Sequence, residues 1–432
     1  MITKYLPNRH AIVMTLMLFF LAPCPPCAVA GVPVKIRVAT YNVALNRKKA
    51  GELIDDLKTS NHPQIRAVAE IIQRVHPDVL LLNEFDFDAK GPGGTSLAAR
   101  LFQKNYLAIG KNGAKPVHYP YVYCAPSNTG VPSGFDLNNN GRTNDPDDAL
   151  GFGRFEGQYG MLILSKYPIA KDKVRTFRKF LWKDMPGALL PDDAATPEKK
   201  DWYSFEELDV VRLSSKSHWD VPVDVAGETI HILASHPVPP VFDGPEDRNG
   251  KRNHDEIRFW SDYITPTKGS YIYDDLKKRG GLEADAHFII MGDLNADPND
   301  SDSTRTQNAI KLLLRSPNIN TTLTPSSEGA LEAGKLQGGV NLKQISNPRY
   351  DTSDWEDAMG CSGNLRADYI LPSKNLKILQ AKVFWPPSAD PLYRLVGDGV
   401  NIVSSDHRMA WIDIEPERRP DSVSKHAGNV HK

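Results

Sequence analysis

Short apolar runs separated by polar connections divide most of the chain into predicted strands and helices. Residues 35–43 (KIRVATYNV) alternate roughly between apolar and polar positions, and this pattern predicts an opening strand. Over residues 62–76 the apolar positions recur on one helical face, and Pro77 ends the predicted helix. Residues 78–84 form the next apolar run and predict a buried strand that ends in a carboxylate. The pattern therefore opens with a strand, a helix and a second strand.

Further apolar runs predict strands, and most follow one another without a regular helix between them. They cover residues 161–164, 210–213, 229–235, 287–291, 367–371, 377–384 and 409–414. This arrangement favours a mixed sheet architecture over a doubly wound parallel sheet. Some connections are longer than compact loops usually are, so we expect them to contain additional elements or functional loops. They cover residues 86–155, 181–207, 239–285 and 316–364.

The composition is that of a globular protein without a strong overall charge. The 432 residues are 40% hydrophobic, and 52 Lys and Arg residues balance 53 Asp and Glu residues. A near-neutral chain has no overall attraction to nucleic acid or anionic lipid, although a local basic groove would still suit a nuclease. No repeat of fixed period is visible, which argues against a solenoid, a collagen-like rod and a coiled coil.

Residues 1–30 have the pattern of a secretory signal. Lys4 and Arg9 precede an apolar run at 11–22, and a small-residue triplet at 28–30 stands before Gly31. The run is shorter than the roughly 20 apolar residues of a membrane span, so we expect cleavage and no transmembrane anchor in the mature chain. The expected location is therefore secreted or periplasmic.

The cysteines leave two alternatives open. Cys24 and Cys27 fall in the predicted cleavage region, so we do not interpret their CxxC spacing as a redox or zinc motif. Cys124 and Cys361 stay in the mature chain, where an oxidising compartment allows either one disulfide or two separate thiols.

The candidate chemistry lies where predicted strands end. The relevant fragments share one form: an apolar strand or its flank, together with a side chain that carries an oxygen or an imidazole. These side chains are Asn42, Glu84, His236, Asp293, Asn295, Asp368, Asp406 and His407. Each one alone is also typical of a turn or a surface position. The shared form favours one common site.

In chain order, these fragments resemble the endonuclease/exonuclease/phosphatase superfamily, the DNase I-like hydrolases. The matching motifs are TYNV at 40–43, LLLNE at 80–84, SHP at 235–237, GDLN at 292–295, RADYI at 366–370 and SDH at 405–407. The resemblance implies an α/β (α+β) fold, a four-layer sandwich of two mixed β-sheets packed face to face and flanked by helices. We expect a signal peptide at 1–30, one such domain with long loop insertions at 31–415, and a mobile polar tail at 416–432.

The resemblance implies a metal site at three of these residues. Asn42, Glu84 and Asp406 would hold a divalent cation, Mg²⁺ or Mn²⁺. Carboxylate and amide oxygens suit such ions better than zinc, and residues 31–432 contain no HExxH and no paired CxxC motif. Ala44 stands where the AP endonucleases have an additional carboxylate, which argues against a DNA-repair specificity.

The resemblance implies catalytic roles for the other five residues. Asp293 and Asn295 would contact the phosphate and assist the metal or the attacking water. His407, oriented by Asp368, would transfer a proton. His236 matches the second histidine of DNase I-like members, which serves the opposite side of the phosphate. The resemblance does not assign which histidine is the acid and which is the base.

Other candidates carry less specific signals. Glu156 and Gln158 are candidates for the acid that pairs with the second histidine. Arg248, Lys251 and Arg252 would either line a phosphate groove or lie solvated in a loop, and the loop is the stronger interpretation.

An insertion at 136–147 resembles a calcium loop. Oxygen-bearing side chains stand at positions 1, 3, 5, 9 and 12 of an EF-hand pattern, with Gly at position 6. They belong to Asp136, Asn138, Asn140, Asn144 and Asp147. Asp at position 12, Pro at position 11 and the lack of flanking amphipathic helices depart from the pattern. A structural Ca²⁺ and a polar turn are therefore both open.

The function that the resemblance implies is metal-dependent hydrolysis of a phosphoester, by attack of water on phosphorus. Two histidines in this arrangement favour a phosphodiesterase or nuclease that acts on extracellular DNA or RNA. The lack of a basic stripe leaves a sphingomyelinase-like phospholipid phosphodiesterase and a phosphomonoesterase as alternatives. A non-catalytic calcium-binding interaction protein is the alternative of another class; it would lack catalytic side chains, and all of them are present. No protein partner is implied.

Overall fold

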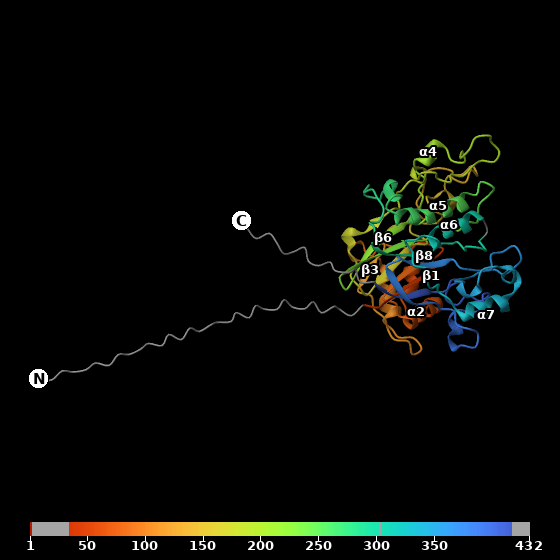
Figure 1. Ribbon diagram of the computed structural model, residues 1–432. Coiled ribbons are helices and arrows are strands. Elements are labelled where there is room, and N and C mark those ends of the chain that lie inside the picture. Colours follow the sequence, from red (N-terminus) through yellow and green to blue (C-terminus); the bar gives the residue numbers. More distant parts are fainter. Residues whose placement is uncertain (2–33, 302–303, 417–432) are drawn as a thin grey trace. The chain divides into compact units, whose positions relative to one another are not determined.

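Two mixed β-sheets pack face to face within the unit that begins at Val34 (Figure 1). The computed structural model describes residues 1, 34–301 and 304–416. The predicted signal peptide after Met1 and the predicted tail from residue 417 lie outside the described residues. Cys24 and Cys27 lie outside them as well.

Each sheet contains one parallel strand pair, β1–β2 in the first and β7–β8 in the second, and its other pairs are antiparallel. The first sheet has the order β12 (Leu376–Val383), β13 (Ala410–Pro416), β1 (Ile36–Leu45), β2 (Val79–Phe85), β4 (Met161–Ser165), β3 (Tyr121–Tyr123). The second has the order β11 (Asp368–Pro372), β8 (His287–Asp293), β7 (Glu228–Ser235), β6 (His218–Val225), β5 (Arg175–Thr176). A further two-stranded sheet pairs β9 (Ser353–Asp354) with β10 (Asn364–Leu365).

The core follows from the alternation of side chains along the strands. Successive side chains of a strand point to opposite faces of its sheet. Val38 and Leu81 of the first sheet therefore meet Ile289 of the second sheet in the central core. Their chain neighbours Ala39 and Leu80 belong to the outer core, which the helices cover.

Helices cover both outer faces of the sandwich. The first sheet packs against α1 (Glu52–Leu57), α2 (Pro63–Val75) and α3 (Leu97–Phe102). The second packs against α5 (Arg248–Tyr263) and α6 (Thr304–Leu314). Among the described residues, α4 (Phe205–Leu208) and α7 (Glu328–Gln337) lie in connections between strands. These layers confirm the predicted four-layer α/β sandwich.

Most predicted strands are present, with bounds shifted by one or two residues, but the strand predicted at 210–213 is wrong. In this segment Arg212 forms a single isolated bridge, to Leu181. The pairing stops there because the partner segment turns into a 3-10 helix at Trp182–Asp184. The segment is therefore a connection between α4 and β6.

The apolar pattern misses two elements that support the site. In β6 the polar residues His218 and Asp220 interrupt the apolar run, and Pro222 disfavours a strand. In α5 the polar residues Asn253 and Glu256 are fully buried, so the helix has no clean apolar face. Both elements carry buried polar groups where the pattern requires apolar ones.

The structure also bears on the two cysteines of the predicted mature chain and on membrane-spanning helices. Cys124 and Cys361 are both free thiols, so the structure contains no disulfide between them. Among the described residues, no helix combines the length and the hydropathy that a membrane crossing requires.

The burial of His218 predicts that the free energy of unfolding falls at acidic pH. Burial lowers the pKa of His218 to about 4, and its Nε2–H donates to the carbonyl oxygen of Glu256 at 2.9 Å. The unfolded chain binds this proton near pH 6.5, so stability present above pH 6.5 is lost as the pH falls toward 4. The loss from pH 7 to 4.5 is roughly 2–3 kcal/mol.

Urea unfolding at pH 7 and pH 4.5 measures this loss. In His218→Phe, which keeps an aromatic ring against Phe259 and Trp260, the difference between the two pH values should shrink by that amount. The variant also removes the hydrogen bonds of His218 to the Glu256 carbonyl and to Ser214, so the comparison uses the pH difference and not the absolute stability. An unchanged pH difference would contradict the assignment.

Candidate active site

Strand direction brings the predicted residues to one edge of the two sheets. β1 and β2 run parallel, so Asn42 and Glu84, near their carboxyl ends, share that edge. β8 ends at Asp293, which pairs in register with Asp368 at the start of antiparallel β11. His407 precedes β13, which is antiparallel to β1 and begins at the same edge. The fold thus gathers side chains that are far apart in the sequence.

Gly292 lets β8 approach β7 closely at this edge. Its φ angle is 146°, and a Cβ atom there would lie 1.9 Å from the carbonyl oxygen of Ser235. Any side chain would clash with that backbone oxygen, so the position requires glycine. The close approach places His236, which directly follows β7, beside the Asp293 carboxylate.

The buried carboxylate of Asp293 is the meeting point of the site. Its Oδ2 atom accepts a hydrogen bond from Nδ2 of Asn42 at 3.0 Å. The same oxygen lies 3.3 Å from Nε2 of His236 and 3.6 Å from Nε2 of His407. Its Oδ1 atom accepts a hydrogen bond from the backbone N–H of Asn295 at 3.0 Å. Four predicted residues therefore contact one side chain.

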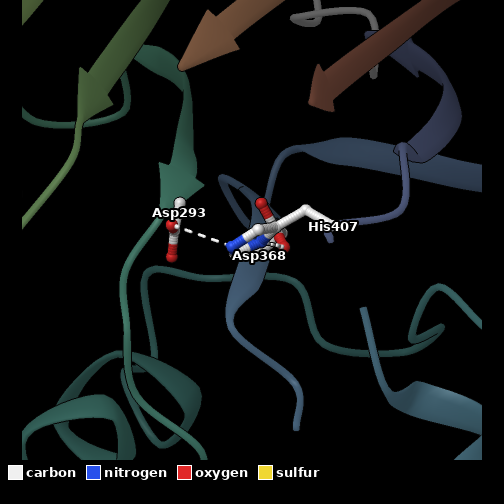
Figure 2. A group of neighbouring side chains, drawn as sticks. All are labelled: Asp293, Asp368 and His407. Atoms are coloured by element: carbon white, nitrogen blue, oxygen red, sulfur yellow. Dashed lines mark hydrogen bonds and ion pairs between the residues drawn. The ribbon is translucent and has the colours of Figure 1, made fainter. Parts of the chain in front are cut away.

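Figure 2 shows the imidazole of His407 between two carboxylates. Its Nδ1 lies 2.8 Å from Oδ2 of Asp368, whose backbone N–H donates to Oγ1 of Thr352 at 2.9 Å. Burial lowers the pKa of His407, but Asp368 and Asp293 outweigh it and raise this pKa well above its usual value. Burial also raises the pKa of Asp293, to about 6.

His236 differs from His407 in its second ring nitrogen. Nδ1 of His236 is buried and has no hydrogen-bond partner among the described residues. Burial, together with the positive charges of Lys216 and His407, lowers the pKa of His236 well below its usual value. Gln158 instead bonds to backbone groups, and Glu156 is exposed. The expected acid partner of the second histidine is therefore not found in the described part of the chain.

Glu84 and Asn295 both adopt left-handed backbone conformations, with φ angles of 57° and 50°. Such conformations are uncommon for residues other than glycine and cluster at functional sites. Oε2 of Glu84 accepts a hydrogen bond from Nδ2 of Asn46 at 2.6 Å. Burial and the negative charge of Asp406 raise the pKa of Glu84. A cation beside Glu84 would relieve this repulsion.

The donor set fits a divalent cation that binds oxygen. Glu84 and Asp406 are both half-buried and lie close enough for the negative charge of Asp406 to raise the pKa of Glu84. Asp293, Asp368 and His407 also place one potential ligand atom each within 4.8 Å of one another. In that second group both ring nitrogens of His407 already face carboxylates. The oxygens of Asn42, Glu84 and Asp406 therefore suit Mg²⁺ or Mn²⁺ better.

Trp355 belongs to the site although the sequence interpretation missed it. Its Nε1–H donates to Oδ2 of Asp406 at 3.3 Å, and its ring lies edge-on to that of His407, with centroids 5.4 Å apart. The backbone N–H of Asp354 in β9 donates to the carbonyl oxygen of Asp406 at 2.8 Å. The only signal for this residue was its place in the long connection at 316–364.

Lys216 is a second residue that the sequence interpretation missed. It is 7% exposed and lines the same cleft as His236 and Asp293. Its Nζ donates to the carbonyl oxygen of Pro237 at 3.2 Å, and burial lowers its pKa. A lone lysine in a polar segment carries no sequence signal. Its position supplies a positive charge beside the buried acids.

Glu256 of α5 holds the two connections that carry Lys216 and His236. Its carboxylate accepts hydrogen bonds from the backbone N–H of Ser215 at 2.6 Å and of Val238 at 2.7 Å. These bonds explain why an acid is buried in a helix that packs on a sheet. Glu256 therefore supports the site without belonging to the predicted set.

The predicted calcium loop is closed by its own hydrogen bonds. Asp136 accepts from the backbone N–H groups of Asn140 and Gly141, at 3.0 and 2.6 Å. Asp147 lies 3.4 Å from the guanidinium of Arg248. Within the described residues, no group of three acids, histidines or cysteines in this loop is close enough to share an ion. A structural Ca²⁺ here stays a prediction.

The site opens into a cleft of about 790 Å³. Its lining includes catalytic and metal-binding candidates from both sheets. These are Glu84, His236, Asp293, Asn295, Asp406 and His407. The volume is in the range of sites that enclose a small molecule.

Comparison with known proteins gives one family match and several structural neighbours. The Endonuclease/Exonuclease/phosphatase family matches residues 39–407. Similar solved structures include an endonuclease/exonuclease/phosphatase from Beutenbergia cavernae, with 18% identity, 88% of this chain and 72% of that chain covered, and a TM-score of 0.46. Another is an endonuclease/exonuclease/phosphatase family protein from Leptotrichia buccalis, with 14% identity, 88% of this chain and 99% of that chain covered, and a TM-score of 0.43. A third is beta toxin from Staphylococcus aureus, with 15% identity, 87% of this chain and 99% of that chain covered, and a TM-score of 0.41. The search of curated proteins finds no match.

We predict that Trp355 positions the carboxylate of Asp406 through its indole hydrogen bond. Trp355→Phe keeps an aromatic ring beside His407 but removes the hydrogen bond to the carboxylate. Loss of one such bond should raise the metal concentration for half-maximal activity roughly five- to tenfold. The measurement is a Mg²⁺ titration of phosphoester hydrolysis, with Met359→Ala, an exposed change in the same connection, as control. An unchanged metal requirement in Trp355→Phe would overturn this role.

Proposed function

Because the chain belongs to the endonuclease/exonuclease/phosphatase family, whose members hydrolyse phosphoesters, we propose that it is an exported, divalent-metal-dependent phosphodiesterase. The observation that carries this proposal is the buried Asp293 carboxylate, which faces the Nε2 atoms of His236 and His407. Because the family is one of hydrolytic phosphoesterases, the alternative of a non-catalytic calcium-binding protein is excluded. Export is proposed from the signal pattern at 1–30.

In this proposal Asn42, Glu84 and Asp406 hold the divalent cation, and Mg²⁺ or Mn²⁺ is the expected ion. When bound, the ion neutralises charge on the phosphate oxygens and helps to activate water. The repulsion between the carboxylates of Glu84 and Asp406, which a cation would relieve, supports the assignment. Trp355 keeps Asp406 in place through the hydrogen bond of its indole N–H.

The histidines move the protons of the reaction. Water adds to phosphorus, the bond between phosphorus and the alcohol oxygen breaks, and the departing oxygen takes up a proton. His407 is held in one orientation by Asp368, as a proton-transfer group requires. His236 provides a second imidazole beside Asp293. Lys216 adds positive charge where the phosphate would bind.

Substitution of His407 tests the proposed chemistry. His407→Ala should lower kcat for bis(p-nitrophenyl) phosphate roughly 10²–10⁴-fold, because one proton-transfer group is lost. Asp368→Asn should lower it less, since the imidazole remains. His118→Ala, at an exposed histidine, is the control. Circular dichroism checks that each variant folds, and nicking of supercoiled plasmid is measured in parallel. Unchanged turnover in folded His407→Ala would rule out the mechanism.

Metal removal tests the proposed ligands. Dialysis against EDTA should abolish hydrolysis, and Mg²⁺ or Mn²⁺ should restore it. Binding is also read without activity, as the rise in melting temperature on adding Mn²⁺. Glu84→Gln should reduce that rise, because a charged ligand is replaced by a neutral amide. Glu156→Gln, at an exposed acid outside the ligand set, is the matched control and should keep it. Equal shifts in both variants would refute Glu84 as a ligand.

A further inference from the structure

The catalytic cleft has a part whose lining is apolar. Side chains from three connections contribute to it, and we call them the apolar arm: Leu150, Phe152, Tyr203, Val238, Val241 and Phe242. Hydrolysis of a phosphoester requires polar groups around phosphorus, and none of these side chains except the Tyr203 hydroxyl provides one. The apolar arm therefore has no role in the chemical step at phosphorus, and its function lies elsewhere.

The apolar arm is continuous with the catalytic residues. The segment 238–242 begins two residues after His236 and lines the same cleft. From another connection, the ring of Phe152 contacts that of Tyr159, with centroids 6.3 Å apart. Tyr159 in turn lines the cleft together with Glu84. A group attached to a phosphate at the catalytic residues would therefore reach the arm.

Helix α5 holds the walls of the apolar arm. The guanidinium of Arg252 donates to the carbonyl oxygen of Leu150 at 2.7 Å and to those of Arg212 and Leu213 at 2.8 and 2.9 Å. One turn further along the helix, Glu256 accepts from the backbone N–H of Val238, as described above. These bonds fix the backbone at Leu150 and Val238. The part of the arm next to the catalytic residues is thus formed before any ligand binds.

The cations beside the arm are already engaged within the protein. Arg252 donates to backbone carbonyls, and Arg248 lies 3.4 Å from both Asp147 and Glu246. A nucleic acid backbone is bound by cations that neutralise successive phosphates. Because these two guanidinium groups are engaged, this part of the cleft suits an uncharged apolar group better than a polyanion.

Two aromatic side chains of the arm are exposed to solvent. Phe152 is 43% exposed and Phe242 is 84% exposed. The φ angle of Phe242 is 68°, a strained value for a bulky residue. Large exposed apolar side chains that line one cleft are typical of a binding surface. Their exposure and strain indicate a ligand that covers them.

We propose that the apolar arm binds an aliphatic alcohol group esterified to the substrate phosphate. The substrate class is then an amphiphilic phosphodiester, with its phosphate at Asp293 and its aliphatic chain along Phe152 and Phe242. This inference rests on the proposed phosphodiesterase function. A soluble alkyl phosphodiester and a membrane lipid share this chemistry.

A series of soluble esters tests the arm. The Mn²⁺-loaded protein is given p-nitrophenyl phosphodiesters whose second alcohol is methanol, butanol or octanol, each below its micellar concentration. Release of p-nitrophenolate reports cleavage, and the alkyl group stays on the phosphate. Because each methylene that enters the arm leaves water, kcat/KM should rise at least tenfold from methyl to butyl, mainly through KM.

Variants locate the effect. Phe242→Ser should reduce the ratio of butyl to methyl kcat/KM at least threefold. Phe205→Ser, at a phenylalanine that is 88% exposed and does not line the cleft, should leave the ratio unchanged. Equal ratios in the two variants would overturn the assignment of Phe242 to the arm. Melting temperatures confirm that both variants fold.

The outcomes separate the two proposals. No cleavage of any ester by folded, metal-loaded protein would overturn the proposed function itself. Cleavage without dependence on chain length, or plasmid nicking more efficient than cleavage of the octyl ester, would overturn the inference and leave the phosphodiesterase function intact. If cleavage depends on alkyl length, release of the headgroup from phosphatidylcholine vesicles assigns the aliphatic group of the substrate to a membrane lipid. If no headgroup is released from the vesicles, the aliphatic group belongs to a soluble amphiphile.

Discussion

The burial of one carboxylate, that of Asp293, constrains the whole catalytic edge. A buried carboxylate is stable only when hydrogen-bond donors or positive charges surround it. Here Asn42 comes from the first sheet, His236 follows a strand of the second, and His407 leads back into the first. The polar network therefore joins the two sheets at the point where their apolar core ends. Packing of the sandwich and alignment of the reacting groups depend on the same contacts.

Helix α5 extends this constraint to the connections around the site. Its buried Glu256 and half-buried Arg252 would destabilise the helix packing if they were unpaired. Each is instead bonded to backbone groups of connections that carry Lys216, His236 or the apolar arm. The helix thus acts as a polar scaffold for segments without regular structure. This explains how long connections hold a defined cleft.

The eight candidate residues could be proposed from the sequence because each stands beside an apolar run, and the repetition of this form along the chain favours one common site. Glu84 and Asp293 stand at or next to the end of a strand, and Asn42 stands near the end of another, whereas the strand directions follow from the pairing in the fold. Trp355 could not be predicted in the same way, since it acts on Asp406, 51 residues further along the chain. Glu256 was hidden for a related reason: a buried acid in a helix interrupts the apolar period that identifies the helix. Contacts made only by tertiary folding leave no periodic pattern.

The chemistry and the choice of substrate lie in different parts of the architecture. Residues that act on phosphorus stand at strand ends, where the sheets fix them within a rigid core. The apolar arm comes from connections, which vary in length and composition without disturbing the strands. Arg248 faces Asp147 and Glu246, and the donors of Arg252 are occupied by backbone carbonyls, so neither guanidinium is free to bind phosphates. Apolar contact, more than attraction of opposite charges, then selects what is attached to the phosphate.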